Sequence, residues 1–253
     1  MRPESRQIEI YRLIKKSKEI SIQALSEYFG VSSMTIRRDL DKLERSNLIY
    51  RTFGKVHICD ETKSEYPFAQ RETTNLDFKK KIAQSALKLI GDMESIYVDG
   101  SSTAYEFVKL LPPDKRLTIF TNSVAIIELL YNMQRKNFRI FVIGGFLSNN
   151  LHALDDNTSP NIIKRIFVDA TFTSCAGFNA DGSFNNGIVG SQILRTMFKN
   201  SSCNVLLADH TKYNAQGIFL LNSWEKINVL ITDEPFETNA MNIIRNQNVK
   251  IIW

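Results

Sequence analysis

The residues of this 253-residue chain that could do chemistry stand in short loops after apolar runs. One loop covers residues 99–103 and lies between the run SIYV and the helical run AYEFVKLL. Glycine lets a ligand approach the backbone, hydroxyls donate hydrogen bonds, and a helix start offers free N–H groups with a partial positive charge. The loop predicts a phosphate cradle, although a plain N-cap with a tight turn explains it equally well. Its residues are Asp99, Gly100, Ser101, Ser102 and Thr103.

Three further loops carry similar residues. Thr121 and Asn122 end one apolar run, Gly144 and Gly145 end the next, and Asp209 to Lys212 follow the run NVLLA. In an open α/β sheet, ligands bind beyond the carboxyl ends of the strands. We therefore expect these loops to form one site, with Asp209 and Lys212 supplying a carboxylate and a cation.

The elements that must position these loops alternate between helical runs and short apolar runs. Continuous apolar runs are typical of strands covered by helices on both faces, so an α/β layered fold is predicted. The expected strands are residues 95–98, 117–121, 139–143, 170–175, 204–208, 229–232 and 249–252.

A different chemistry is indicated near the N-terminus, between Ile22 and Arg51. Apolar residues recur there at helical spacing in two runs separated by Gly30, where a left-handed backbone can end a helix. Ser21 is placed to cap the first run, and Ser32 or Ser33 the second. In the second run Ile36, Leu40 and Leu43 face inward. The pattern predicts a helix-turn-helix that reads DNA.

The outer face of the second helix carries short donors and guanidinium groups, which can reach base edges and phosphates in a major groove. Residues 1–60 hold twelve Lys or Arg against eight acids, which is +4 of the chain's net charge of +5. After Asn47, LIYRTFGKVHI predicts a two-stranded wing that brings Arg51 and Lys55 toward the DNA backbone or minor groove. The predicted DNA-binding residues are Ser32, Ser33, Thr35, Arg37, Arg38, Lys42, Arg51 and Lys55.

Residues 1–57 resemble the N-terminal domain of the DeoR family of bacterial transcriptional regulators. The resemblance rests on the GVS turn at residues 30–32, on TIRRDL at residues 35–40, and on Arg51 shortly before Gly54. Where the family usually has a second glycine at the wing tip, this chain has Lys55.

The remainder is similar to the sensor domain of that family, which is related in fold to ribose-5-phosphate isomerase and binds phosphorylated sugars or related metabolites. The matching segments are Arg71, residues 81–83, 99–103, 121–122, 143–145, Asp209 with Lys212, and residues 231–233. The resemblance implies that residues 100–103 hold phosphate, that Asp99 binds sugar hydroxyls and that Lys212 binds an anionic or carbonyl oxygen. This chain departs from the family at Asp155 and Asp156, and near Val189 it lacks an expected glutamate.

The expected organisation is a winged helix-turn-helix (α+β) over residues 1–58, a linker over 59–76, and an α/β sensor and oligomerisation domain over 77–253. The three cysteines, Cys59, Cys175 and Cys203, have no CxxC spacing and are interpreted as small hydrophobic residues. No secretory or membrane-spanning apolar run is visible, so we expect a cytoplasmic protein.

These features favour a DNA-binding transcriptional regulator, and a repressor of carbohydrate uptake or catabolism genes in particular. The expected partners are double-stranded operator DNA, a phosphorylated effector and further copies of the chain in a homodimer or homotetramer, with no cofactor, metal or membrane. Two alternatives remain open. The second domain could only oligomerise, or Asp99, Asp209 and Lys212 could catalyse proton transfer in a sugar-phosphate isomerase-like enzyme.

Overall fold

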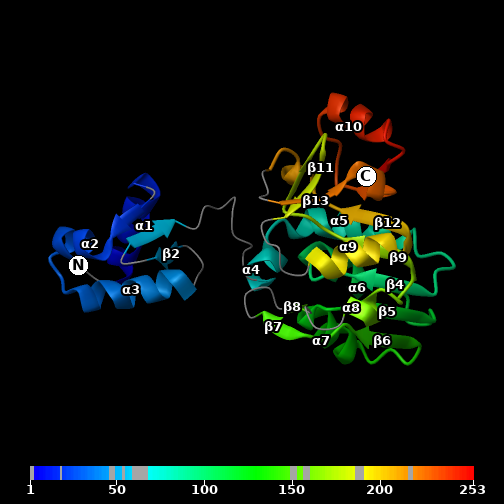
Figure 1. The fold of residues 1–253 in the computed structure, drawn as a ribbon, viewed down its shortest axis with the longest axis horizontal. Coiled ribbons are helices and arrows are strands. Elements are labelled where there is room, and N and C mark those ends of the chain that lie inside the picture. Colours follow the sequence, from blue (N-terminus) through cyan, green and yellow to red (C-terminus); the bar gives the residue numbers. More distant parts are fainter. Residues whose placement is uncertain are drawn as a thin grey trace. The chain divides into compact units, whose positions relative to one another are not determined.

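The computed structural model of the protein describes residues 3–17, 19–45, 49–52, 55–58, 68–148, 153–155, 160–185, 191–215 and 219–253. The chain divides into two compact units, Met1–Ser64 and Glu65–Trp253. Figure 1 shows both units, coloured along the sequence.

The N-terminal unit packs three helices against a small antiparallel sheet. Its elements are α1 (Pro3–Ser17), β1 (Glu19–Ser21), α2 (Ile22–Phe29), α3 (Ser33–Arg45), β2 (Ile49–Thr52) and β3 (Lys55–Ile58). The core joins one apolar face of each helix to the sheet, and its fully buried residues include Ile10 and Ile14 of α1, Leu25 of α2 and Ile36 of α3. A winged helix-turn-helix was predicted from the sequence, and the structure has this arrangement, with α1 as the third helix of its core.

The wing contains one strand more than the sequence indicated. The sheet order is β1-β3-β2, and β1 pairs with β3 through Glu19 opposite His57 and Ser21 opposite Lys55. The strand β1 was not predicted because three residues directly before a helix are too few to show a strand's alternating pattern. It forms because it pairs with β3, which lies more than thirty positions further along the chain.

The C-terminal unit is an α/β domain. Its elements begin with α4 (Phe68–Thr73), α5 (Leu76–Leu87), β4 (Ser95–Val98), α6 (Ser102–Lys109), β5 (Leu117–Thr121), α7 (Val124–Met133), β6 (Phe138–Val142), β7 (Phe146–Ser148), β8 (Ala153–Asp155), α8 (Pro160–Ile163) and β9 (Val168–Thr173). They continue with β10 (Gly177–Asn179), β11 (Gly182–Asn185), α9 (Ser191–Lys199), β12 (Ser201–Leu207), the 3-10 helix η1 (His210–Lys212), β13 (Phe219–Ser223), η2 (Trp224–Lys226), β14 (Val229–Ile231), α10 (Thr238–Arg245) and β15 (Lys250–Ile252).

A seven-stranded parallel sheet in the order β15-β14-β12-β9-β4-β5-β6 forms the centre of this unit. Successive side chains of a strand point to opposite faces. Ile96 and Val98 of β4 accordingly pack with α5, α6 and α7, whereas Tyr97 packs on the other side with α9 and α10. Helices therefore cover both faces, as Figure 1 shows. The predicted α/β layered fold is confirmed.

All seven strands predicted for this sheet are present, each within three residues of its expected ends. One expectation about them is wrong. The strand β6 is not covered on both faces, because it lies at the edge of the sheet and four of its five residues are exposed. Three strands, β10, β11 and β13, form a separate small sheet that the sequence did not predict, and β7 pairs with β8 in a hairpin.

The range predicted as a linker, residues 59–76, contains the helix α4. Phe68 at the start of α4 is buried and meets Tyr105 of α6, with ring centroids 5.2 Å apart. The helix therefore packs within the C-terminal unit.

Candidate functional sites

The helices α2 and α3 have the caps that the sequence indicates. The Ala24 N–H donates to Ser21 Oγ at 3.0 Å, and Gly30 has φ of 62° at the end of α2. Ser32 rather than Ser33 caps α3, because the Thr35 N–H donates to Ser32 Oγ at 3.2 Å. These local bonds set the direction in which α3 leaves the turn.

The helix α3 presents a polar face to solvent. Ser33, Arg37 and Arg38 are exposed, while Ile36 and Leu40 on the opposite face are completely buried. The hydroxyls of Ser32 and Thr35 lie 3.0 Å apart, so both are already engaged with each other. Exposed guanidinium groups near a helix N-terminus can form bidentate bonds with guanine or with phosphate.

The structure describes only some of the side chains predicted to contact DNA from the wing. Lys55 begins β3, where its Nζ donates to Glu19 Oε1 of β1 at 2.7 Å. Both side chains are about half exposed, so this ion pair contributes little to stability and can exchange for a phosphate. Arg51 lies on β2 as predicted, but the side chains of Lys42 and Arg51, and Gly54, lie outside the described residues.

A buried ion pair that the sequence analysis missed fixes α3 to α1. Arg6 Nε donates to Asp39 Oδ2 at 2.6 Å, and Gln7 Nε2 donates to Asp39 Oδ1 at 2.9 Å. The side chains of Arg6 and Asp39 are only 10% and 5% exposed. The signal was present, because Asp39 follows Ile36 by three residues and therefore lies on the inward face of α3.

In the C-terminal unit, the loop after β4 holds Asp99 through backbone donors. Ser101 N–H donates to Asp99 Oδ1 and Ser174 N–H donates to Asp99 Oδ2, both at 3.0 Å. Burial raises the pKa of Asp99, and the hydrogen bonds from Ser101 and Ser174 oppose part of that rise. Ser101 also caps α6, because Ala104 N–H donates to its Oγ at 3.2 Å.

The rest of this loop is largely enclosed. Ser102 and Thr103 are buried, and Thr103 Oγ1 has no hydrogen-bond partner in the described part of the chain. A Cβ on Gly100 would lie 3.4 Å from Cβ and Oγ of Ser123 and 3.9 Å from Cβ of Ala153. These are ordinary van der Waals distances, so the packing of this loop against the next loop and the β7–β8 hairpin does not by itself require glycine at position 100.

Asn122 and Thr121 connect the second loop to its surroundings. Tyr97 OH donates to Asn122 Oδ1 at 3.0 Å, and Asn122 Nδ2 donates to the Leu154 carbonyl at 2.9 Å. Thr121 Oγ1 accepts from Ser123 N–H at 3.1 Å. Both side chains thus have structural roles, whatever further bonds they make. The side chain of Asp155 and all of Asp156 lie outside the described residues.

Gly144 and Gly145 follow the edge strand β6 and are exposed. A Cβ on Gly144 would meet nothing within 4 Å. Among the described residues, close packing thus gives no reason for glycine at position 144.

Lys212 and Asp99 meet through Ser174, at the carboxyl ends of three neighbouring strands. Lys212 Nζ donates to Ser174 Oγ at 2.9 Å and to the Cys175 carbonyl at 2.8 Å, while Ser174 N–H donates to Asp99. Asp209 is buried and accepts a hydrogen bond from Thr211 Oγ1. Asp99, Asp209 and Lys212, which are 113 residues apart at most, therefore belong to one group of charges.

A second lysine joins this group and was not among the predicted site residues. Lys79 of α5 is 4% exposed, and its Nζ donates to the carbonyls of Arg71 and Thr74. Burial, followed by the positive charge of Lys212, lowers the pKa of Lys79 to about 8. Two cations close enough to affect each other in a buried setting are suited to bind an anion. The spacing of Lys79 from Ile82 and Ala83 placed it on the buried face of α5.

The cysteines fit the interpretation as small hydrophobic residues where the structure describes them. Burial raises the pKa of Cys175 to about 12 and also raises the pKa of Cys203. A thiol with a raised pKa is a poor nucleophile near neutral pH. Cys59 lies outside the described residues. Among the described helices, none is both long and apolar enough to cross a membrane.

A helix-turn-helix unit followed by an α/β unit with a charged site at its strand ends defines a DNA-binding regulator with a sensor domain. Residues 6–62 match the DeoR-like helix-turn-helix domain, and residues 74–234 match the DeoR C-terminal sensor domain. The chain belongs to the DeoR family of transcriptional regulators, as the resemblance in its sequence indicated.

Relatives align along nearly their whole length. The chain is 32% identical to the transcriptional regulator GolR of Listeria innocua, over 92% of this chain and 91% of the relative. It is 29% identical to the L-fucose operon activator of Haemophilus influenzae (96% and 97%) and 26% identical to the glycerol-3-phosphate regulon repressor of Escherichia coli (99% and 99%). All three are named for the control of genes.

Among solved structures, the chain is similar to ribose 5-phosphate isomerase A from Methanocaldococcus jannaschii. The TM-score is 0.38 with 18% identity, over 56% of each chain.

Proposed function

We propose that this regulator is a repressor of carbohydrate uptake or catabolism genes that releases its operator when a phosphorylated sugar or related metabolite binds the C-terminal unit. The names of two relatives, an L-fucose operon activator and a glycerol-3-phosphate regulon repressor, support this class of target gene. In the proposed assembly, a homodimer or homotetramer presents two α3 helices to operator half-sites about one helical turn apart.

The observation that carries the proposed effector site is the group formed by Lys79, Lys212, Asp99 and Asp209. Lysine ammonium groups attract phosphate, and the N-terminus of α6 next to Asp99 adds free N–H groups. Carboxylates accept hydrogen bonds from sugar hydroxyls. One end of the ligand is then recognised by charge and the other by hydrogen bonding.

The proposed DNA contacts are the exposed residues Ser33, Arg37 and Arg38 of α3, together with Ser32, Thr35, Lys42, Arg51 and Lys55. The proposed effector contacts are residues 99–103, Thr121, Asn122, Gly144, Gly145, Asp209 and Lys212, to which the structure adds Lys79.

The coupling of the two sites is tested by a gel shift at fixed salt with DNA from upstream of the protein's own gene and its neighbours. We expect one compound in a panel of sugar phosphates to release the DNA, because an effector that alters operator affinity must bind the two states differently. Lys212→Ala should keep DNA affinity within about twofold and lose the response to that compound. Lys250→Ala, which removes an exposed lysine of the same unit, is the matched control.

Operator binding that is tight and indifferent to every compound would contradict the proposed effector control. It would favour instead a C-terminal domain that only oligomerises. A Lys212→Ala variant that responds as well as the unmodified chain would exclude Lys212 from the site without affecting the rest of the proposal.

The lowered pKa of Lys79 makes anion binding at this site depend on pH. The ammonium of Lys79 loses its proton as the pH rises through about 8, so the affinity for an anion should fall over the same range. Sulfate is a suitable probe because its own charge is constant there. Calorimetry at pH 8.5 in two buffers of different ionisation enthalpy should show proton uptake when sulfate binds.

The matched variant for this measurement is Lys79→Gln, with correct folding checked by circular dichroism. We expect it to bind sulfate more weakly and without proton uptake. If the unmodified chain takes up no proton when sulfate binds, Lys79 does not contact the anion. The same conclusion follows if Lys79→Gln takes up as much proton as the unmodified chain.

A further inference from the structure

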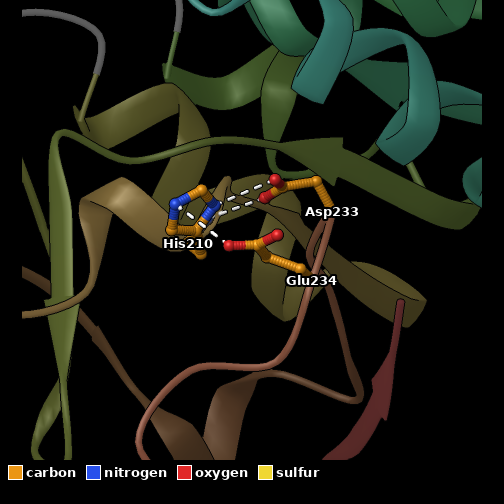
Figure 2. A group of neighbouring side chains, drawn as sticks. All are labelled: His210, Asp233 and Glu234. Atoms are coloured by element: carbon orange, nitrogen blue, oxygen red, sulfur yellow. Dashed lines mark hydrogen bonds and ion pairs between the residues drawn. The ribbon is translucent and has the colours of Figure 1, made fainter.

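A cluster of three side chains outside the proposed effector contacts lies at the ends of β12 and β14. Its members are His210, Asp233 and Glu234, shown in Figure 2. One ligand atom from each residue lies within 4.8 Å of the others. We propose that this cluster binds one divalent transition-metal ion of the zinc or manganese class, with His210 Nε2 and the Glu234 carboxylate as ligands and Asp233 as the residue that orients the imidazole.

The imidazole of His210 stands between two carboxylates. Its Nδ1 is 2.9 Å from Asp233 Oδ2, and its Nε2 is 3.3 Å from Glu234 Oε1. A neutral imidazole carries one N–H, so it donates to one carboxylate and turns a lone pair toward the other. That lone pair and the negative carboxylate repel each other. A cation between the second nitrogen and its carboxylate removes this repulsion. That cation is either a proton or a metal ion.

The two sides of the imidazole differ in a way that assigns the cation to Nε2. The Asp233 side chain is fully buried, and its Oδ1 accepts from the His210 backbone N–H at 2.8 Å. Asp233 is therefore fixed, and its Oδ2 holds the proton on Nδ1. A carboxylate that accepts from the second nitrogen of a metal-binding histidine is a recurrent arrangement, because it sets the tautomer and the ring orientation.

The open side has the separation that a metal ion requires. Two ligands at about 2.1 Å from one ion, at angles of roughly 90° to 110°, lie about 3.0 to 3.4 Å apart. The 3.3 Å between His210 Nε2 and Glu234 Oε1 falls within this range. Glu234 is 52% exposed, so water can complete the coordination. One imidazole nitrogen with carboxylate and water oxygens suits zinc or manganese better than the all-oxygen sites of magnesium and calcium.

The position of the cluster connects it to the charged group described above. His210 begins η1, which also contains Lys212, and Asp209 directly precedes it. The ring of Phe78 packs against the His210 ring, with centroids 5.0 Å apart, and Asn75 Nδ2 donates to Thr211 Oγ1 at 3.2 Å. A metal ion held by His210 and Glu234 would restrain η1 against the loop after β14, and the ring contact with Phe78 connects η1 to α5, which carries Lys79.

The proposal is tested by calorimetry on the full chain, freed of metal with a chelator and titrated with Zn²⁺ or Mn²⁺ at one pH and salt concentration. We expect one equivalent of Zn²⁺ to bind. Glu234→Gln should lower the affinity at least tenfold, and His210→Gln should abolish this binding. Asp233→Asn should lower it roughly 10- to 100-fold. Glu225→Gln, which alters another exposed carboxylate of this unit, should leave it unchanged.

Two results would overturn the metal site. The unmodified chain could bind neither ion, which would leave a proton as the cation between His210 and Glu234. Alternatively, binding could persist unchanged in both His210→Gln and Glu234→Gln, which would place the ion elsewhere. Glu234 is half exposed, so its variant should fold even if the variant of the buried Asp233 does not.

Discussion

Replacing Asp39 with Ala should destabilise the N-terminal unit by about 3–5 kcal/mol, because Arg6 would remain buried without its partner. A unit of this size has a free energy of unfolding of roughly 3–9 kcal/mol, at 0.05–0.15 kcal/mol per residue. The variant should therefore unfold α1–α3 at moderate temperature and lose operator binding, while the C-terminal unit stays folded. Hydrogen exchange on the full chain measures the two units separately.

An exposed pair on α1 provides the control. Arg12 and Glu9 lie 3.4 Å apart, with the side chain of Arg12 exposed and that of Glu9 partly exposed, so Glu9→Ala should change stability by less than about 1 kcal/mol. The double substitution Arg6→Met with Asp39→Leu removes both charges and should recover most of the lost stability. If Asp39→Ala proves as stable as Glu9→Ala, the buried pair does not hold α3 in place.

Replacing Arg37 with Ala should weaken operator binding by about 1–3 kcal/mol, which is roughly 5- to 150-fold. Arg37 is exposed on α3, whereas its neighbour Ile36 is completely buried, so the substitution removes a surface group and leaves the core intact. The measurement is fluorescence anisotropy with the operator and with an unrelated duplex. Lys16→Ala, which removes an exposed charge from α1, controls for net charge.

The pattern of losses tells which contact Arg37 makes. A loss confined to the operator indicates a base contact, and Arg37→Lys should not restore it because lysine lacks the planar fork. An equal loss on both duplexes, restored by lysine, indicates a phosphate contact. Operator affinity equal to that of the unmodified chain would exclude Arg37 from the interface.

Much of the fold could be predicted because its signals are local. The caps at Ser21 and Gly30 and the inward face at Ile36 and Leu40 depend on residues within one or two turns. The strands of the central sheet were recognisable as short apolar runs since helices cover them. Where that covering is missing, at the edge strand β6, the prediction of burial was wrong.

The candidate sites were predictable only in part. The loops with Asp99 and with Asp209 were recognised because turn and cap residues follow apolar runs, and the structure connects Asp99 to Lys212 through Ser174. Lys79 was missed because a lysine in a helix is usually solvated, and its burial depends on α5 packing against the unit.

The sequence by itself determined the two helices of the helix-turn-helix, the seven strands of the central sheet, the exposed polar face of α3 and the family of regulators to which the chain belongs. The tertiary structure decided the strand order, the added strand β1, the pair of Arg6 with Asp39 and the cluster of His210 with Asp233 and Glu234. The physical reason is separation along the chain. Periodicity and capping act between neighbours, whereas these contacts join residues 21 to 74 positions apart and exist only after the chain has folded.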